Sequence, residues 1–238
     1  MAGSGGPSAC ATGEASVAGV VSGTCVGYKK PSYQSIFGNP HDGVRDQPDV
    51  SLFAGNGIWG HYYVLCYSNP LGGGVPCSVP PSDWVGGGGT SFASPIMAGI
   101  QSLVNQATGS AQGNPNFIYY SLAASQYGAS GDSGCNSTQG SGSSPGCIFH
   151  DVTLGDMAVN CLPLSGAGAT GTRFDCFYPK TDPGVNGVLS LSNTSYKPAY
   201  PAAAGWDFAT GIGSVNAYNL VANWPGSKLT PKQKKIER

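Results

Sequence analysis

The sequence predicts a mixed fold of strands and helices, joined by long loops that disulfides close. Two apolar runs, over residues 49–54 and 62–66, are typical of buried strands. Apolar residues recur at helical spacing over residues 96–104. Eight cysteines fall in segments rich in glycine, serine and proline. Hydrophobic residues make up 40% of the chain, which is enough to bury a core.

Three segments are expected to be helical. The clearest one ends at Gly109 and has its apolar residues one and two turns apart on one face. These residues are Ile96, Met97, Ile100, Leu103 and Val104. The spacing places Pro95 in the first turn, where a missing N–H is tolerated. Further helices are expected over residues 116–124, after Pro115, and around residues 217–221.

The distribution of charge excludes two classes of partner. Residues 228–238 carry five bases and one acid, whereas the rest of the chain carries six bases and 11 acids. A mildly acidic, lysine-poor body is unsuited to phosphate backbones, so we expect no nucleic-acid partner. No run of 18 apolar residues occurs, so we expect no membrane partner. The segment 225–238 is interpreted as a disordered basic tail, such as a cloning or readthrough scar.

The cysteines form four neighbouring pairs along the chain. Sequential pairing would close short loops between residues 10 and 25, 66 and 77, 135 and 147, and 161 and 176. Eight cysteines allow about 105 connectivities, of which this one is the least demanding. An even number of cysteines in polar loops favours an oxidising compartment, and therefore secretion. Residues 1–6 lack the features of a signal peptide, so we expect that an N-terminal part is missing.

Ser91 is the candidate nucleophile. It lies in a glycine-rich segment that leads directly into the clearest helix. At a helix N-terminus, free N–H groups and the positive end of the dipole favour a developing oxyanion. Gly-Thr-Ser alone is more often a simple helix cap, but the complete string over residues 88–99 favours a nucleophile.

That string resembles the Gly-Thr-Ser-x-x-x-Pro motif of the subtilisin-like clan. Residues 30–34 and 45–51 are similar to the run that precedes the core strand in sedolisins, the serine-carboxyl peptidases of that clan. Residues 149–153 and 205–213 resemble the two halves of the sedolisin calcium site. The resemblance covers about residues 29–224, after a loop-rich segment 1–28, and corresponds to the C-terminal half of the catalytic domain. It implies a subtilisin-like α/β fold, with a parallel sheet flanked by helices.

The resemblance implies an endopeptidase that hydrolyses peptide or protein substrates by acyl transfer to Ser91. Sedolisins also use a Glu-x-x-x-Asp pair as base and a second Asp in the oxyanion hole. Glu14 and Glu237 do not fit that pattern, so these groups are expected in an N-terminal half, which would then be a partner. Two alternatives remain open. One is a non-catalytic, calcium-stabilised remnant or binding module, and the other is a weak esterase with Glu14, His41 or His61 as its base.

The resemblance also implies one bound Ca²⁺. Asp151 and Asp207 would supply carboxylates, and Val152, Ala203 and Gly205 would supply backbone carbonyls. A set of hard oxygen ligands without Cys or His suits Ca²⁺. Ala203 stands where the family usually has Gly. The alternative is that the two acids simply cap local turns.

Overall fold

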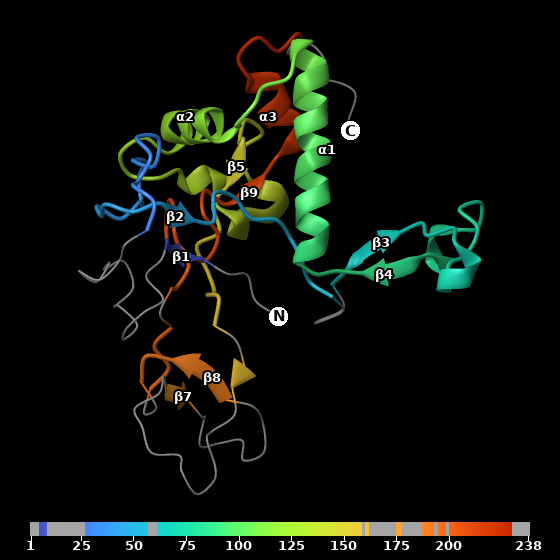
Figure 1. The fold of residues 1–238 in the computed structure, drawn as a ribbon, viewed down its shortest axis with the longest axis horizontal. Helices are drawn as coiled ribbons and strands as arrows, with labels where there is room; N and C mark the ends of the chain where they lie inside the picture. Colours follow the sequence, from blue (N-terminus) through green and yellow to red (C-terminus); the bar gives the residue numbers. More distant parts are fainter. Residues whose placement is uncertain are drawn as a thin grey trace, which may run out of the picture.

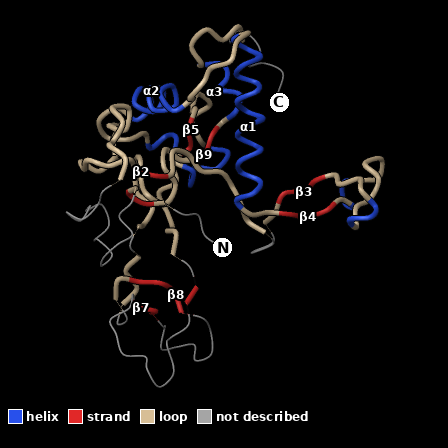
Figure 2. Tube along the Cα trace, in the orientation of Figure 1, coloured by secondary structure: helices blue, strands red, loops and turns tan. Residues whose placement is uncertain are grey.

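The computed structural model describes residues 5–8, 27–56, 61–158, 160–161, 175–177, 187–192, 195–198 and 200–229. Figure 1 shows a body of helices and loops, with a long helix along one side. A hairpin projects from the lower end of that helix, and a small sheet projects from the base of the body. Figure 2 shows that loops account for most of the remaining described chain.

The three expected helices are confirmed as α1 (Thr90–Thr108), α2 (Asn116–Tyr127) and α3 (Ala217–Asn223). Gly109 ends α1 in a left-handed conformation, with φ of 77°, and its N–H bonds to the carbonyl of Asn105. The sequence predicted Pro95 in the first turn of this helix. Because α1 begins at Thr90, Pro95 lies instead in its second turn. Pro95 therefore leaves the carbonyl of Ser91 without its intrahelical donor.

All named strand pairs are antiparallel. β1 (Gly6–Pro7) pairs with β2 (Asp46–Gln47), β3 (Tyr63–Leu65) with β4 (Val85–Gly87), and β5 (Phe149–His150) with β9 (Ser214–Val215). A three-stranded sheet has the order β6 (Asn160–Cys161), β8 (Gly187–Ser190), β7 (Asp175–Phe177). Short 3₁₀ helices span Pro70–Gly72, Pro81–Asp83, Ser133–Cys135 and Ser137–Gly142.

The expected parallel sheet is not seen in the described part of the chain. Parallel pairing is limited there to isolated bridges, Ser51 with Ser214 and Asn136 with Asp151. The segment 49–54 is extended, but it makes only scattered backbone hydrogen bonds, to residues 212, 213 and 89, so it does not become a named strand. The run 62–66 contains β3, yet it is not buried as expected, because Val64 is 54% exposed.

The core is built mainly from aromatic side chains. α2 contributes Tyr119, Tyr120 and Tyr127, which pack with Phe149 of β5 and with side chains from the C-terminal segment. Those C-terminal side chains are Trp206, Phe208, Ile212, Leu220, Val221 and Trp224. From α1 only Ile100 and Val104 are buried. The core therefore lies between α2, α3 and one face of the C-terminal half of α1 (Figure 1).

Two of the four expected disulfides are confirmed. Cys66 pairs with Cys77 and Cys135 with Cys147, with Cα separations of 5.3 and 5.5 Å. The pairings 10–25 and 161–176 fall outside the side chains that the structure describes, and they stay predictions.

At the C-terminus, residues 225–229 still pack on the body, where the N–H of Lys228 donates to the carbonyl of Ala107 at 2.9 Å. The rest of the expected tail, residues 230–238, lies outside the described residues. No helix in the described part of the chain is both long and apolar enough to span a bilayer.

Candidate functional site

Glycines fix the position of the candidate nucleophile. Gly89 is the N-cap of α1 with φ of 109°, and its N–H donates to the carbonyl of Ala54 at 2.7 Å. A Cβ at Gly88 would lie 1.7 Å from the carbonyl oxygen of Gly55, so no larger residue fits this crossing. The chain thus turns sharply from the end of the extended segment into α1. Ser91 is exposed in the first turn of that helix, as the sequence predicted.

An aromatic cluster lies beside this turn. The ring of Tyr63 stacks on Phe92 with centroids 5.6 Å apart, and Phe53 meets Tyr63 edge-on at 5.2 Å. The hydroxyl of Tyr63 donates to the carbonyl of Phe53 at 2.6 Å, which holds the cluster to the extended segment. Sequence reasoning missed this cluster, because its members come from three separate segments of the chain.

No acid or base within the described residues is hydrogen-bonded to Ser91. His61 is exposed and its ring lies 6.5 Å from that of Phe53, at the edge of the aromatic cluster. His41 is exposed in a turn, and His150 lies in β5 opposite Ser214. Glu14 falls outside the described residues. The structure therefore shows an accessible serine at a helix N-terminus, without a general base from the part of the chain that it describes.

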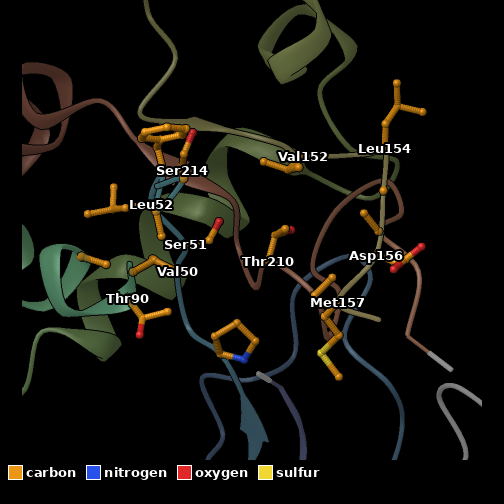
Figure 3. Close-up of a pocket in the computed structure, with 18 of the residues that line it drawn as sticks. Val50, Ser51, Leu52, Thr90, Val152, Leu154, Asp156, Met157, Thr210 and Ser214 are labelled. Carbon is orange, nitrogen blue, oxygen red and sulfur yellow. The ribbon is translucent and has the colours of Figure 1, made fainter. Parts of the chain in front are cut away.

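A groove of about 660 Å³ lies next to the start of α1. One wall is the extended segment 48–55, and the opposite wall is the segment 152–157 (Figure 3). Thr90 and Ala93 of α1 line it, but Ser91 does not. The groove and the serine are therefore neighbouring features at the first turn of α1.

The two expected calcium-binding acids are both buried, with exposures of 2% for Asp151 and 6% for Asp207. Asp151 accepts a hydrogen bond from the N–H of Gly205 at 2.8 Å, and Asp207 accepts one from the N–H of Ala203 at the same distance. Asp207 also caps the next turn by accepting from the N–H groups of residues 209 and 210. The second carboxylate oxygen of Asp151, Oδ1, is buried without a hydrogen-bond partner.

The electrostatics of this pair indicate an uncompensated negative charge. Burial raises the pKa of Asp151 to about 6, and the nearby charge of Asp207 adds to the rise. Burial also raises the pKa of Asp207, although the N–H groups of Ala203, Thr210 and Ala209 oppose it. Two buried carboxylates, each with a raised pKa, are a setting in which a cation can replace the protons.

The backbone supplies further oxygens in the same loops. Within the described residues, the carbonyls of Val152, Ala203 and Gly205 accept no hydrogen bond. The described chain contains no cluster of three or more His, Cys, Asp or Glu side chains, so carbonyl oxygens would have to complete a metal site. Together with the orphan oxygen of Asp151, this donor set fits a hard divalent cation such as Ca²⁺.

Comparisons with known proteins give a distant likeness. No family model matches the sequence, and no curated protein matches it. Seven solved chains are similar, among them a Pseudomonas sedolisin, described as a serine-carboxyl proteinase, in complex with two molecules of pseudo-iodotyrostatin. The sequence identity is 22% and the TM-score 0.43, over 82% of this chain and 34% of the sedolisin. The chain thus spans about a third of that sedolisin's length. This distant likeness assigns neither a family nor an activity to the chain.

Proposed function

We propose that this chain is the nucleophile-bearing part of a sedolisin-like serine endopeptidase. The observation that carries the proposal is the exposed position of Ser91 in the first turn of α1. There the free N–H groups of the helix and its dipole favour the negative charge that develops when a serine attacks a carbonyl. Ser91 Oγ would attack the carbonyl carbon of a peptide bond, form an acyl-enzyme and release the amine. Water would then release the acid.

The described residues supply only part of the catalytic apparatus. A general base contributes about 10² to 10⁴-fold, and one oxyanion-hole donor about 10² to 10³-fold. We therefore expect slow or undetectable peptide cleavage by the chain alone. Activated esters need less help, because their leaving groups are better, so weak ester hydrolysis through Ser91 is expected.

A fluorophosphonate probe and an activated ester test this proposal at pH 4 and pH 7. Ser91→Ala should abolish both labelling and ester turnover. Ser94→Ala is the matched control, because Ser94 is also exposed on α1. Equal labelling of the Ser91→Ala variant would show that Ser91 is not the nucleophile. Fast Ser91-dependent peptide cleavage would show instead that the chain contains a base of its own, to be sought first at His61.

A non-catalytic, calcium-stabilised module is the second candidate. The specific observation in its favour is that Ser91 has no base among the described residues. This candidate predicts no labelling of Ser91 by the fluorophosphonate, together with full stabilisation by calcium. The two candidate functions therefore predict different results for Ser91 labelling and the same stabilisation by calcium.

We propose further that Asp151 and Asp207 bind one Ca²⁺ with carbonyls of Val152, Ala203 and Gly205. The support is the buried, unpartnered Oδ1 of Asp151 beside a second buried carboxylate. Bound Ca²⁺ would supply charge neutralisation and a cross-link between the loops after β5 and before β9. It would stabilise the folded state by mass action, by about 2.7 kcal/mol at a hundredfold excess over Kd.

Melting temperatures in CaCl₂ and in EDTA test the calcium site. The wild type should melt several degrees higher with calcium, whereas Asp151→Asn should lose this difference. Asp83→Asn, at an exposed position, is the control and should behave as the wild type. A wild-type protein that melts identically in both buffers would contradict the site.

The two described disulfides fit an oxidising, extracellular location, which we propose for this chain.

A further inference from the structure

The disulfide between Cys66 and Cys77 is accessible to solvent. Cys77 is exposed and Cys66 is half-buried, whereas Cys135 and Cys147 of the other described disulfide are only 2% and 1% exposed. A disulfide is reduced by the attack of a thiolate on one of its sulfur atoms, so access controls the rate. Of these two disulfides, a reductant therefore reaches only the one between Cys66 and Cys77 while the protein is folded.

This disulfide closes the far end of the β3–β4 hairpin, which few other contacts hold together. The two strands share three residue pairs, beginning with Tyr63 and Gly87. Cys66 follows β3 directly, and none of the described residues between 61 and 87 belongs to the buried core. A two-stranded hairpin on its own is marginally stable in water. Loss of the covalent bond should therefore loosen the hairpin while the body stays folded.

The same hairpin supports the first turn of α1. Tyr63 of β3 stacks on Phe92, the residue after Ser91, with ring centroids 5.6 Å apart. A Cβ at Gly87 would lie 2.9 Å from the ring of Phe92, so the backbone of β4 also packs against this ring. The N–H of Phe92 donates to the carbonyl of Gly89 at 3.0 Å and closes the turn. A loosened hairpin would withdraw both supports from Phe92 and let this turn open.

We propose that the disulfide between Cys66 and Cys77 is a redox switch: a dithiol reduces it, the β3–β4 hairpin loosens, and the first turn of α1 opens. When the turn is open, the N–H groups that favour the oxyanion are no longer held beside Ser91, so the reactivity of Ser91 falls. This last consequence rests on the proposed function of Ser91. The opening of the turn does not, because it depends only on the contacts of the hairpin.

The reduction consists of two thiol–disulfide exchanges. A thiolate of the dithiol attacks Sγ of Cys77, the exposed partner, and forms a mixed disulfide. The bond between Cys66 and Cys77 breaks, and its electron pair leaves on Sγ of Cys66, which takes up a proton. The second thiolate of the dithiol then attacks the dithiol's own sulfur in the mixed disulfide, which closes a cyclic disulfide and releases Cys77 as a thiol. The dithiol thereby loses two electrons, and the two cysteines gain them.

Alkylation under native conditions tests whether this disulfide is reduced selectively. The folded protein is incubated with increasing concentrations of dithiothreitol, quenched with iodoacetamide and mapped by peptide mass spectrometry. Cys66 and Cys77 should become alkylated at a dithiothreitol concentration at least tenfold lower than Cys135 and Cys147. Reduction of both pairs over the same range of concentration overturns the proposal.

Amide hydrogen exchange at Phe92 tests the coupling between the hairpin and α1. In the selectively reduced protein this amide should exchange at least threefold faster than in the oxidised protein. The amide of Val104, in the buried part of α1, should not change. The variant Cys66→Ala/Cys77→Ala should show the faster exchange at Phe92 with or without dithiothreitol. Equal exchange at Phe92 in the oxidised and the selectively reduced protein overturns the proposal.

Labelling of Ser91 by the fluorophosphonate measures the consequence for reactivity. The labelling rate should fall at least threefold on selective reduction. Tyr63→Ala keeps the disulfide but removes the stacked ring, so it should label slowly in both redox states. An unchanged labelling rate in a protein whose exchange at Phe92 has risen overturns the effect on Ser91. Absence of labelling in the oxidised protein contradicts the proposed function instead, and exchange at Phe92 then decides whether the switch exists.

Discussion

The hydroxyl of Tyr120 donates a hydrogen bond of 3.0 Å to the carboxylate of Asp49. The same oxygen accepts hydrogen bonds from the side chains of Gln34, at 2.8 Å, and Trp206, at 3.1 Å. Tyr120 is only 1% exposed, and burial raises its pKa, so it remains a donor at any physiological pH. A single phenol thus joins α2 to the extended segment, to the loop at residue 34 and to the C-terminal loop.

Tyr120→Phe should lower the free energy of unfolding by about 2 to 6 kcal/mol. The substitution leaves two buried donors, on Gln34 and Trp206, without their acceptor, and each unsatisfied donor costs about 1 to 3 kcal/mol. Urea denaturation followed by tryptophan fluorescence measures the loss. Tyr119→Phe is the matched control, because Tyr119 is also buried on α2 but makes one hydrogen bond, of 3.2 Å, to Gln101. A loss in Tyr120→Phe no larger than in Tyr119→Phe would contradict this role.

Titration of the Asp46 carboxyl should make the free energy of unfolding depend on pH. It is fully buried and pairs with the ammonium of Lys30 at 2.5 Å. Desolvation outweighs this ion pair and raises the pKa of Asp46 from its ordinary value of 3.8 to about 6. The folded state therefore binds the proton more tightly than the unfolded state does. The resulting stabilisation is complete below pH 4 and is lost as the pH rises through 6.

This contribution should reach about 3 kcal/mol, since one pKa unit corresponds to about 1.4 kcal/mol. Free energies of unfolding, measured for the wild type and Asp46→Asn in EDTA between pH 4 and pH 7, isolate the contribution of Asp46. The advantage of the wild type should shrink as the pH rises, because asparagine does not titrate. Asp83→Asn, an exposed change, should run parallel to the wild type. A difference between wild type and Asp46→Asn that stays constant with pH would refute the assignment.

The sequence predicted those parts of the fold that local signals determine. The apolar spacing from Ile96 to Val104 and the glycine at position 109 fixed the course of α1, because both act within a few residues. Two neighbouring cysteine pairs were correct for a similar reason, since short loops bring their ends together at little entropic cost.

Features that depend on distant segments could not be predicted. The run 62–66 could be buried only if another part of the chain packed over it. The structure instead places it in an exposed hairpin. The parallel sheet implied by the resemblance needs neighbouring strands for residues 49–54, and in the described chain their parallel pairing is limited to the bridge between Ser51 and Ser214. The aromatic cluster beside Ser91 and the bonds to Tyr120 join residues up to 86 positions apart, which no local pattern reveals.

Glycine at position 205 is expected to be indispensable for the proposed calcium loop. Its φ is 82°, and an added Cβ would lie 2.6 Å from the carbonyl oxygen of Phe37. Gly205→Ala should therefore combine backbone strain of about 1 to 2 kcal/mol with overpacking of about 1 to 3 kcal/mol. Gly73→Ala is a matched control, because Gly73 has φ of 80° but open space around its Cβ position. Urea unfolding should show the larger loss for Gly205→Ala, and equal losses would mean that the contact with Phe37 is relieved at no cost.

The two described disulfides close loops of nearly equal length, with separations of 11 and 12 residues, but they should differ in their effect on stability. The chain-entropy model alone assigns each about 3 kcal/mol. Cys135 and Cys147 are buried, and their backbones bond to Asp151 and Asn219. Cys66 and Cys77 lie in the projecting β3–β4 hairpin (Figure 1), which contributes no residue to the buried core.

The double variant Cys135→Ala/Cys147→Ala should therefore lose about 3 kcal/mol of unfolding free energy in urea. The variant Cys66→Ala/Cys77→Ala should lose less than about 1 kcal/mol in the same transition, because the hairpin can loosen without opening the core. Its effect should appear instead as faster local proteolysis between residues 66 and 77. Similar losses of global stability in both variants would show that the hairpin and the body unfold as one cooperative unit.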